Sequence, residues 1–129
     1  EAFIKHSNWP KNLASPYIVS SSEKLLKKFS EFKKGITATA SGFYAPQGRE
    51  LRIKPAIEDL HQKMNTFQFE GNRITNFEME TSALYFLGKS LGHNTLTICA
   101  IIGNRITQKQ SKDYKKTVDK LILAVLEKL

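Results

Sequence analysis

Asn76-Phe77-Glu78-Met79-Glu80-Thr81 is the stretch that decides the fold, because it follows a short β-like run and opens a helix-like one. Side chains alternate along an extended segment, so Glu78 and Glu80 point to the same side. Two carboxylates directed into one pocket are costly to desolvate unless a ligand uses them. A sugar diol or a developing cation is such a ligand. We therefore expect a polar ligand where this strand passes into its helix.

Helical and extended patterns alternate along the rest of the chain. Helices are predicted from Ser20-Ser21-Ser22-Glu23 to Gly35, over 57–68, over 79–91, and from a cap at Ser111 to the C-terminus. Strands are predicted over 36–40, 74–78 and 96–102, an irregular segment over 1–17, and a loop over 41–56. This order predicts one α/β domain over 1–129, a sheet with helices packed on it.

The charge balance is basic, with 20 Lys and Arg against 12 Asp and Glu, a formal net charge of +8. A nucleic-acid-binding domain would gather these cations on one face with interleaved aromatic residues. Here they are scattered and mostly lie on predicted helix faces, so we expect a solvated surface and no nucleic-acid partner. No apolar run approaches the ~20 residues that span a bilayer, so we expect no membrane partner either.

Cys99 is the single cysteine and lies in the apolar run 96–102. We expect a buried, inert thiol and a reducing, cytoplasmic compartment. The histidines His6, His61 and His93 lie in unrelated contexts without metal-ligand spacing. We therefore expect no metal site.

Three predicted strands run into polar segments at their carboxyl ends. These segments are Ser41–Arg49, Glu78–Glu80 and Gly103–Arg105. Ligands of open α/β sheets gather at the carboxyl ends of strands, so we expect the three segments to form one site.

The side chains of these segments suit a heterocyclic base. The planar amide of Gln47 matches adjacent carbonyl and N–H groups such as those of uracil. Arg49 and Arg105 are always charged and can stabilise negative charge on a departing base. Phe43 can pack on a ring. Taken singly, each residue has an ordinary explanation as a loop or surface residue, so the prediction rests on their shared position at strand ends.

The second group suits a sugar. Glu80 can hold ribose hydroxyls while Met79 lies against the apolar face of the sugar. Each again has an ordinary explanation, since an acid at a helix N-terminus is favoured by the helix dipole and a methionine is usually part of the core.

Three stretches of the chain resemble the nucleoside phosphorylases of the uridine phosphorylase and hexameric purine phosphorylase type. Thr75–Ala83 resembles their Met-Glu signature. Gly35–Ala38, followed by Phe43-Tyr44 and Gln47-Gly48-Arg49, resembles the uracil-recognition stretch of uridine phosphorylases. Ile101–Arg105 resembles the strand end that supplies a second arginine on the base side.

The resemblance implies a three-layer α/β/α domain and reversible phosphorolysis of uridine to uracil and ribose 1-phosphate through an oxocarbenium-like transition state. It implies base binding by Phe43, Gln47, Arg49 and Arg105, ribose binding by Glu78, Met79 and Glu80, and catalytic roles for Gln47, Arg49 and Glu80. Inorganic phosphate is the implied co-substrate, without a further cofactor. The implied assembly is a homo-oligomer built from dimers.

Two other functions stay open. One is a purine nucleoside phosphorylase or nucleosidase of the same superfamily, which would need an acid after the third strand. Ile102-Gly103 stands at that place and supplies none. The other is a nucleoside-binding relative without catalytic activity.

The resemblance covers the C-terminal half of the family domain. The phosphate site of the family lies in the N-terminal half, so we expect no phosphate-binding residue in this chain and no activity of the chain alone. We also expect sheet edges and apolar surface to be exposed.

Overall fold

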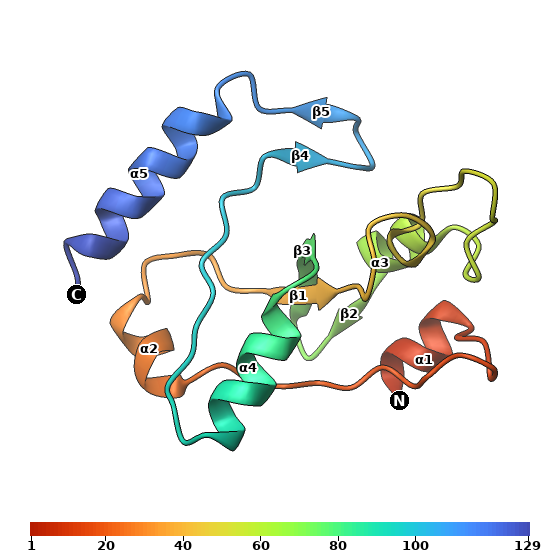
Figure 1. The fold of residues 1–129 in the computed structure, drawn as a ribbon, viewed down its shortest axis with the longest axis horizontal. Helices are drawn as coiled ribbons and strands as arrows, with labels where there is room; N and C mark the ends of the chain where they lie inside the picture. Colours follow the sequence, from red (N-terminus) through yellow and green to blue (C-terminus); the bar gives the residue numbers. More distant parts are fainter.

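Two parallel strands, β1 and β3, form the centre of the structure. The computed structural model describes residues 1–129 and shows a mixed α/β chain with two small sheets (Figure 1). The strands are β1 Ile36–Thr39, β2 Gln68–Phe69, β3 Asn72–Glu78, β4 Gly103–Asn104 and β5 Lys109–Gln110. The helices are α1 Ala2–Ser7, α2 Glu23–Lys28, the 3-10 turn η1 Ala45–Gln47, α3 Leu60–Thr66, α4 Thr81–Ser90 and α5 Tyr114–Leu126.

The register of the central pair aligns the ends of both strands. The first sheet has the order β1-β3-β2, with β1 parallel and β2 antiparallel to β3. Thr39 is paired with Glu78, and the Ala40 amide donates to the Glu78 carbonyl at 2.9 Å. β4 and β5 form a separate antiparallel pair. The chain segments that follow β1 and β3 therefore start side by side.

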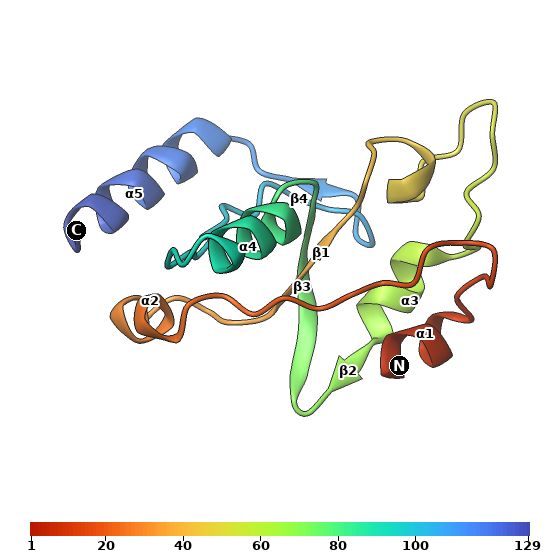
Figure 2. The same cartoon turned by 60° about the horizontal axis from the view of Figure 1, so that its bottom comes forward.

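Helices lie on both sides of the central strands. Both views place α2 and α4 on one side of β1 and β3, and α1 and α3 on the other (Figures 1 and 2). α1 packs on the end of α3 through Phe3 and Phe67, whose rings meet edge to face at 5.1 Å. Residues 1–17 were predicted to be irregular, which is wrong for α1, a short helix held by this aromatic contact.

Most predicted elements are present with shifted bounds. The strands predicted over 36–40 and 74–78 are confirmed as β1 and β3, and the later three helices as α3, α4 and α5. The first predicted helix is confirmed only as α2, capped by the Ser22 hydroxyl. The cap predicted at Ser111 is wrong, because the Asp113 carboxylate accepts from the Lys116 amide at 3.1 Å.

The strand predicted over 96–102 is wrong. This segment forms no ladder with a neighbouring strand. Side chains and single backbone bonds hold it instead: the Ser22 amide donates to the Thr95 carbonyl at 2.9 Å, and the Thr97 amide donates to the Tyr85 hydroxyl at 3.0 Å. A β-branched sequence becomes a strand only where a partner pairs with it. The sheet is therefore small, and it does not show the three-layer architecture implied by the resemblance.

The apolar core is small. The buried hydrophobic residues are Phe29, Ala40, Ile57, Leu60 and Phe67. Neither α5 nor the outer face of α4 is covered, and Leu87 is 57% exposed. The prediction of a buried thiol is also wrong, because Cys99 lies exposed in the unpaired segment. No helix is long and apolar enough to cross a bilayer.

Candidate functional site

The loop after β1 turns sharply and buries an amide side chain. η1 makes a tight turn in which the amides of Gln47 and Arg49 both donate to the Tyr44 carbonyl at 3.0 Å. Gly48 ends the turn with φ of 72°, a left-handed conformation that costs glycine little. Gln47 is only 3% exposed, although it lies in a loop. A buried amide needs partners, so its surroundings define the site.

Two arginines converge on the Gln47 side chain. Its Oε1 accepts from Arg49 Nη1 and from Arg105 Nη2, each at 2.5 Å. Because both partners are donors, the amide orientation follows from chemistry: Oε1 faces the guanidiniums and the NH2 group faces away. That NH2 group donates no hydrogen bond within the chain, so it is available to an acceptor on a ligand.

Aromatic rings support both arginines. The Arg49 guanidinium lies 3.7 Å from the centroid of Phe43 and donates to the Phe43 carbonyl. The Arg105 guanidinium lies 5.3 Å from the centroid of Phe77. Cations at such distances are attracted by the ring faces. Phe43 is 52% exposed, which leaves part of its surface for a ligand.

Neither arginine has a carboxylate partner. The single ion pair of the chain joins Lys128 and Glu31 and involves neither arginine. Burial lowers the pKa of Arg105 below its ordinary value, and the nearby charge of Arg49 lowers it further. Two cations that share one neutral amide leave the site electropositive. It therefore favours an electron-rich or anionic group.

Glu78 stabilises the junction between β3 and α4. One oxygen accepts from the Thr39 hydroxyl at 2.6 Å, and the other accepts from the amides of Glu80 and Thr81 at 2.8 and 2.7 Å. Burial acts to raise the pKa of Glu78, but these hydrogen bonds outweigh it and hold the pKa below the usual range. Glu78 is thus an ionised cap for the first amides of α4.

Glu80 and Met79 are more open to solvent than Glu78. Met79 is 37% exposed, and Glu80 accepts one hydrogen bond, from the Met79 amide at 3.1 Å. Most of the acceptor capacity of Glu80 is therefore free for hydroxyl groups. No hydrogen bond or ion pair joins Glu78 or Glu80 to the arginines.

The structure brings most of the predicted residues together. Phe43, Gln47, Arg49 and Arg105 form one connected group, although Arg105 follows the short strand β4 and not the strand predicted over 96–102. The carboxylate group is linked to it through β3, since Phe77 under Arg105 directly precedes Glu78.

Sequence reasoning missed two residues of this site, His61 and Phe77. His61 was given no role in the site from the sequence, but its Nε2 lies 2.7 Å from the Gln47 carbonyl oxygen and 3.4 Å from Arg105 Nη1. Phe77 belongs to the stretch Asn76–Thr81, but only the fold shows that it lies beneath Arg105. No motif marks His61, because α3 brings it in from 14 residues away.

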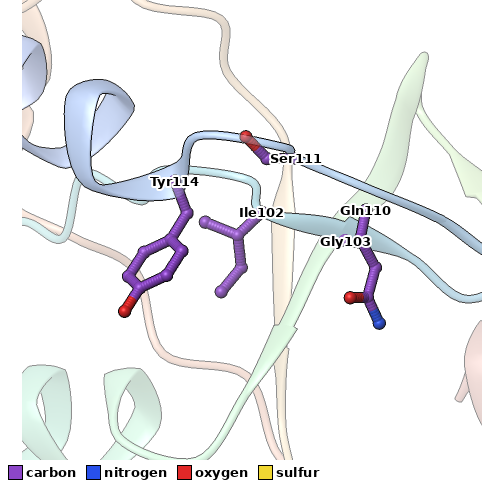
Figure 3. A pocket seen from close by; sticks show the side chains of 5 residues that line it. All are labelled: Ile102, Gly103, Gln110, Ser111 and Tyr114. Carbon is purple, nitrogen blue, oxygen red and sulfur yellow. The ribbon is translucent and has the colours of Figure 1, made fainter.

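Two open hollows lie on the surface of the chain. The larger, of about 790 Å³, borders Gly48, His61 and Arg105 and extends along the 54–62 segment. The smaller, of about 310 Å³, lies where β5 leads into α5, and Figure 3 shows Ile102 and Tyr114 facing each other there while Gln110 points away. Of the predicted site residues, only Arg105 lines the larger hollow, where it lies beside His61, and none lines the smaller one.

Comparison with known proteins agrees with the geometry. The chain is 34% identical over 89 residues to a protein of Thermococcus kodakarensis named uridine phosphorylase, an alignment that covers 64% of this chain and 29% of that protein. The chain thus spans less than a third of that relative. No solved structure matches this chain. The family described as the phosphorylase superfamily matches residues 5–127, which confirms the resemblance, and the chain belongs to this superfamily.

Proposed function

We propose that this chain carries the base and ribose sites of a uridine phosphorylase. The observation that supports this most strongly is the pair of guanidiniums without carboxylate partners that converge on the buried oxygen of Gln47. When the glycosidic bond of uridine breaks, its electron pair passes to the base. Fixed cations stabilise such developing charge.

The remaining groups supply recognition of the base. The free NH2 group of Gln47 donates to a carbonyl oxygen of uracil, and the ring of Phe43 offers an apolar face to the base. Because the site presents donors in excess, it favours a base rich in acceptors. Uracil, with two carbonyl oxygens, meets this requirement.

Ribose lies at the junction of β3 and α4 in this proposal. Glu80 accepts hydrogen bonds from ribose hydroxyls, and Met79 contacts the apolar face of the sugar. Glu78 fixes the junction through its bonds to Thr39 and Thr81. An oxygen of inorganic phosphate attacks the anomeric carbon as the bond to the base breaks, giving ribose 1-phosphate and uracil. We assign no phosphate-binding residue to this chain.

The test is phosphate-dependent release of uracil from uridine by the protein that carries this chain. We expect release with phosphate and none without it, and a loss of at least tenfold in kcat/KM for Glu80→Gln. Glu127→Gln, at the end of α5, is the matched control and should keep full activity. Release without phosphate would indicate a nucleosidase, and cleavage of purine nucleosides alone would overturn the proposed base specificity.

A further inference from the structure

His61 occupies a position that none of the proposed roles explains. It is the second residue of α3, and the buried side chain of Leu60 anchors this end of the helix. The imidazole is half-buried, and its ring meets the edge of Phe77 at 6.2 Å between centroids. Its Nε2 points at the main-chain carbonyl of Gln47 at 2.7 Å.

The direction of this hydrogen bond is set by chemistry. A carbonyl oxygen only accepts, so Nε2 must carry the proton and donate it. Arg105 Nη1 donates to the same carbonyl at 3.3 Å. Both lone pairs of the Gln47 carbonyl are therefore occupied, one by His61 and one by Arg105. Together with the bonds to Oε1, these contacts hold the main chain and the side chain of Gln47 at once.

Gly48 makes the approach of the imidazole feasible. A Cβ at this position would lie 3.0 Å from His61 Nε2, closer than side chains normally approach, and the φ of 72° disfavours other residues. The turn at Gln47-Gly48 and the ring of His61 thus fit each other closely.

We infer that His61 is a positioning residue that directs the Gln47 amide at the base, an inference that rests on the proposed function for its effect on uracil. Without the Nε2 donor, the Gln47 carbonyl loses a partner and the turn can rotate. The amide then points at the base for a smaller fraction of the time, and affinity falls without any lost contact between His61 and the ligand.

The test compares two replacements of this side chain. His61→Phe keeps a ring against Phe77 but cannot donate, whereas His61→Gln places an amide donor near the position of Nε2. We expect the dissociation constant for uracil to rise about tenfold in His61→Phe, the effect of one lost buried hydrogen bond, and to recover within about threefold in His61→Gln. His93 is exposed, so the control variant His93→Phe should bind uracil as the wild type does. Should His61→Phe not fold, His61→Asn replaces it, because its shorter amide does not reach the carbonyl.

A second readout separates this inference from the proposed function. In NMR spectra, the side-chain NH2 of Gln47 and the Nη–H groups of Arg105, which donate to Gln47, should shift in His61→Phe and stay in place in His61→Gln. If the wild type fails to bind uracil but these signals still shift in His61→Phe, the proposed function is overturned and the role of His61 is kept. Unchanged Gln47 signals and uracil affinity in a folded His61→Phe would overturn the role of His61.

Discussion

The hydroxyl of Thr39 donates a 2.6 Å hydrogen bond to the carboxylate of Glu78, across the ends of two parallel strands. The same hydroxyl oxygen accepts from the Ser82 amide at 3.1 Å. One threonine therefore joins β1, β3 and the first turn of α4. This link holds the ribose side of the proposed site in a fixed relation to the loop that carries the base side.

Thr39→Val should destabilise the chain by about 1–2 kcal/mol, because it removes the donor to a half-buried carboxylate and leaves the Ser82 amide unpaired. Thr37 lies on the same strand and makes no side-chain hydrogen bond, so Thr37→Val should change stability by less than about 0.5 kcal/mol. Urea denaturation of both variants measures the difference. Equal stabilities would show that the Thr39 hydroxyl contributes nothing at this junction.

Stability should fall in acid through Glu78. Its pKa is held below the ordinary 4.5 in the folded chain. Stabilisation by this group is therefore complete above the unfolded pKa and is lost as the pH falls through the folded pKa. The midpoint of thermal unfolding, followed from pH 7 to pH 3, should drop less steeply in Glu78→Gln than in wild type. Parallel curves would contradict this assignment.

Gln47→Glu tests the electropositive site. The carboxylate would form ion pairs with Arg49 and Arg105 and would replace the NH2 donor by an acceptor. We expect at least a tenfold weaker affinity for uracil with a fold as stable as that of the wild type. Gln68→Glu, exposed on β2, adds the same charge away from the site and should bind normally. Calorimetric titration with uracil provides the measurement, and undiminished binding by Gln47→Glu would argue against base recognition here.

Alanine substitutions at two glycines with similar backbone angles distinguish the cost of backbone strain from the cost of crowding by a neighbouring side chain. Gly48 has φ of 72° and faces His61, whereas Gly92 has φ of 75° and would meet nothing within 4 Å. Gly92→Ala should cost about 1 kcal/mol from its backbone alone. Gly48→Ala should cost more, and combination with His61→Ala should recover the excess. Equal costs in the two single variants would mean that the imidazole moves aside freely.

Local patterns predicted the parts of the fold that need only short-range information. β1 is rich in Thr and Ala, β3 precedes a clear helix pattern, and both were predicted from alternation and β-branching. The placement of Gln47 and Arg49 after β1 followed from the general position of ligands at strand ends. Arg105 also reaches this group, but from the turn between β4 and β5 rather than from the predicted strand over 96–102.

The missed features depend on contacts between distant parts of the chain. The 96–102 segment has strand-like residues, but pairing needs a free neighbour, which its composition does not specify. For the same reason Cys99 is exposed rather than buried. His61 reaches Gln47 only because α3 packs beside the loop, and the weak helical pattern over 57–68 carries no sign of that contact.

Successive residues of β3 serve the two halves of the proposed site. Phe77 lies under the base-side Arg105, and Glu78 bonds the ribose-side Thr39. Neighbouring side chains on a strand point to opposite faces of the sheet, so this division follows from the alternation of side chains along β3. A slip of one residue between β1 and β3 would exchange the two faces, placing a phenyl ring against Thr39 and a carboxylate beneath the guanidinium. The spacing between nucleobase and sugar groups is therefore encoded in the backbone register itself.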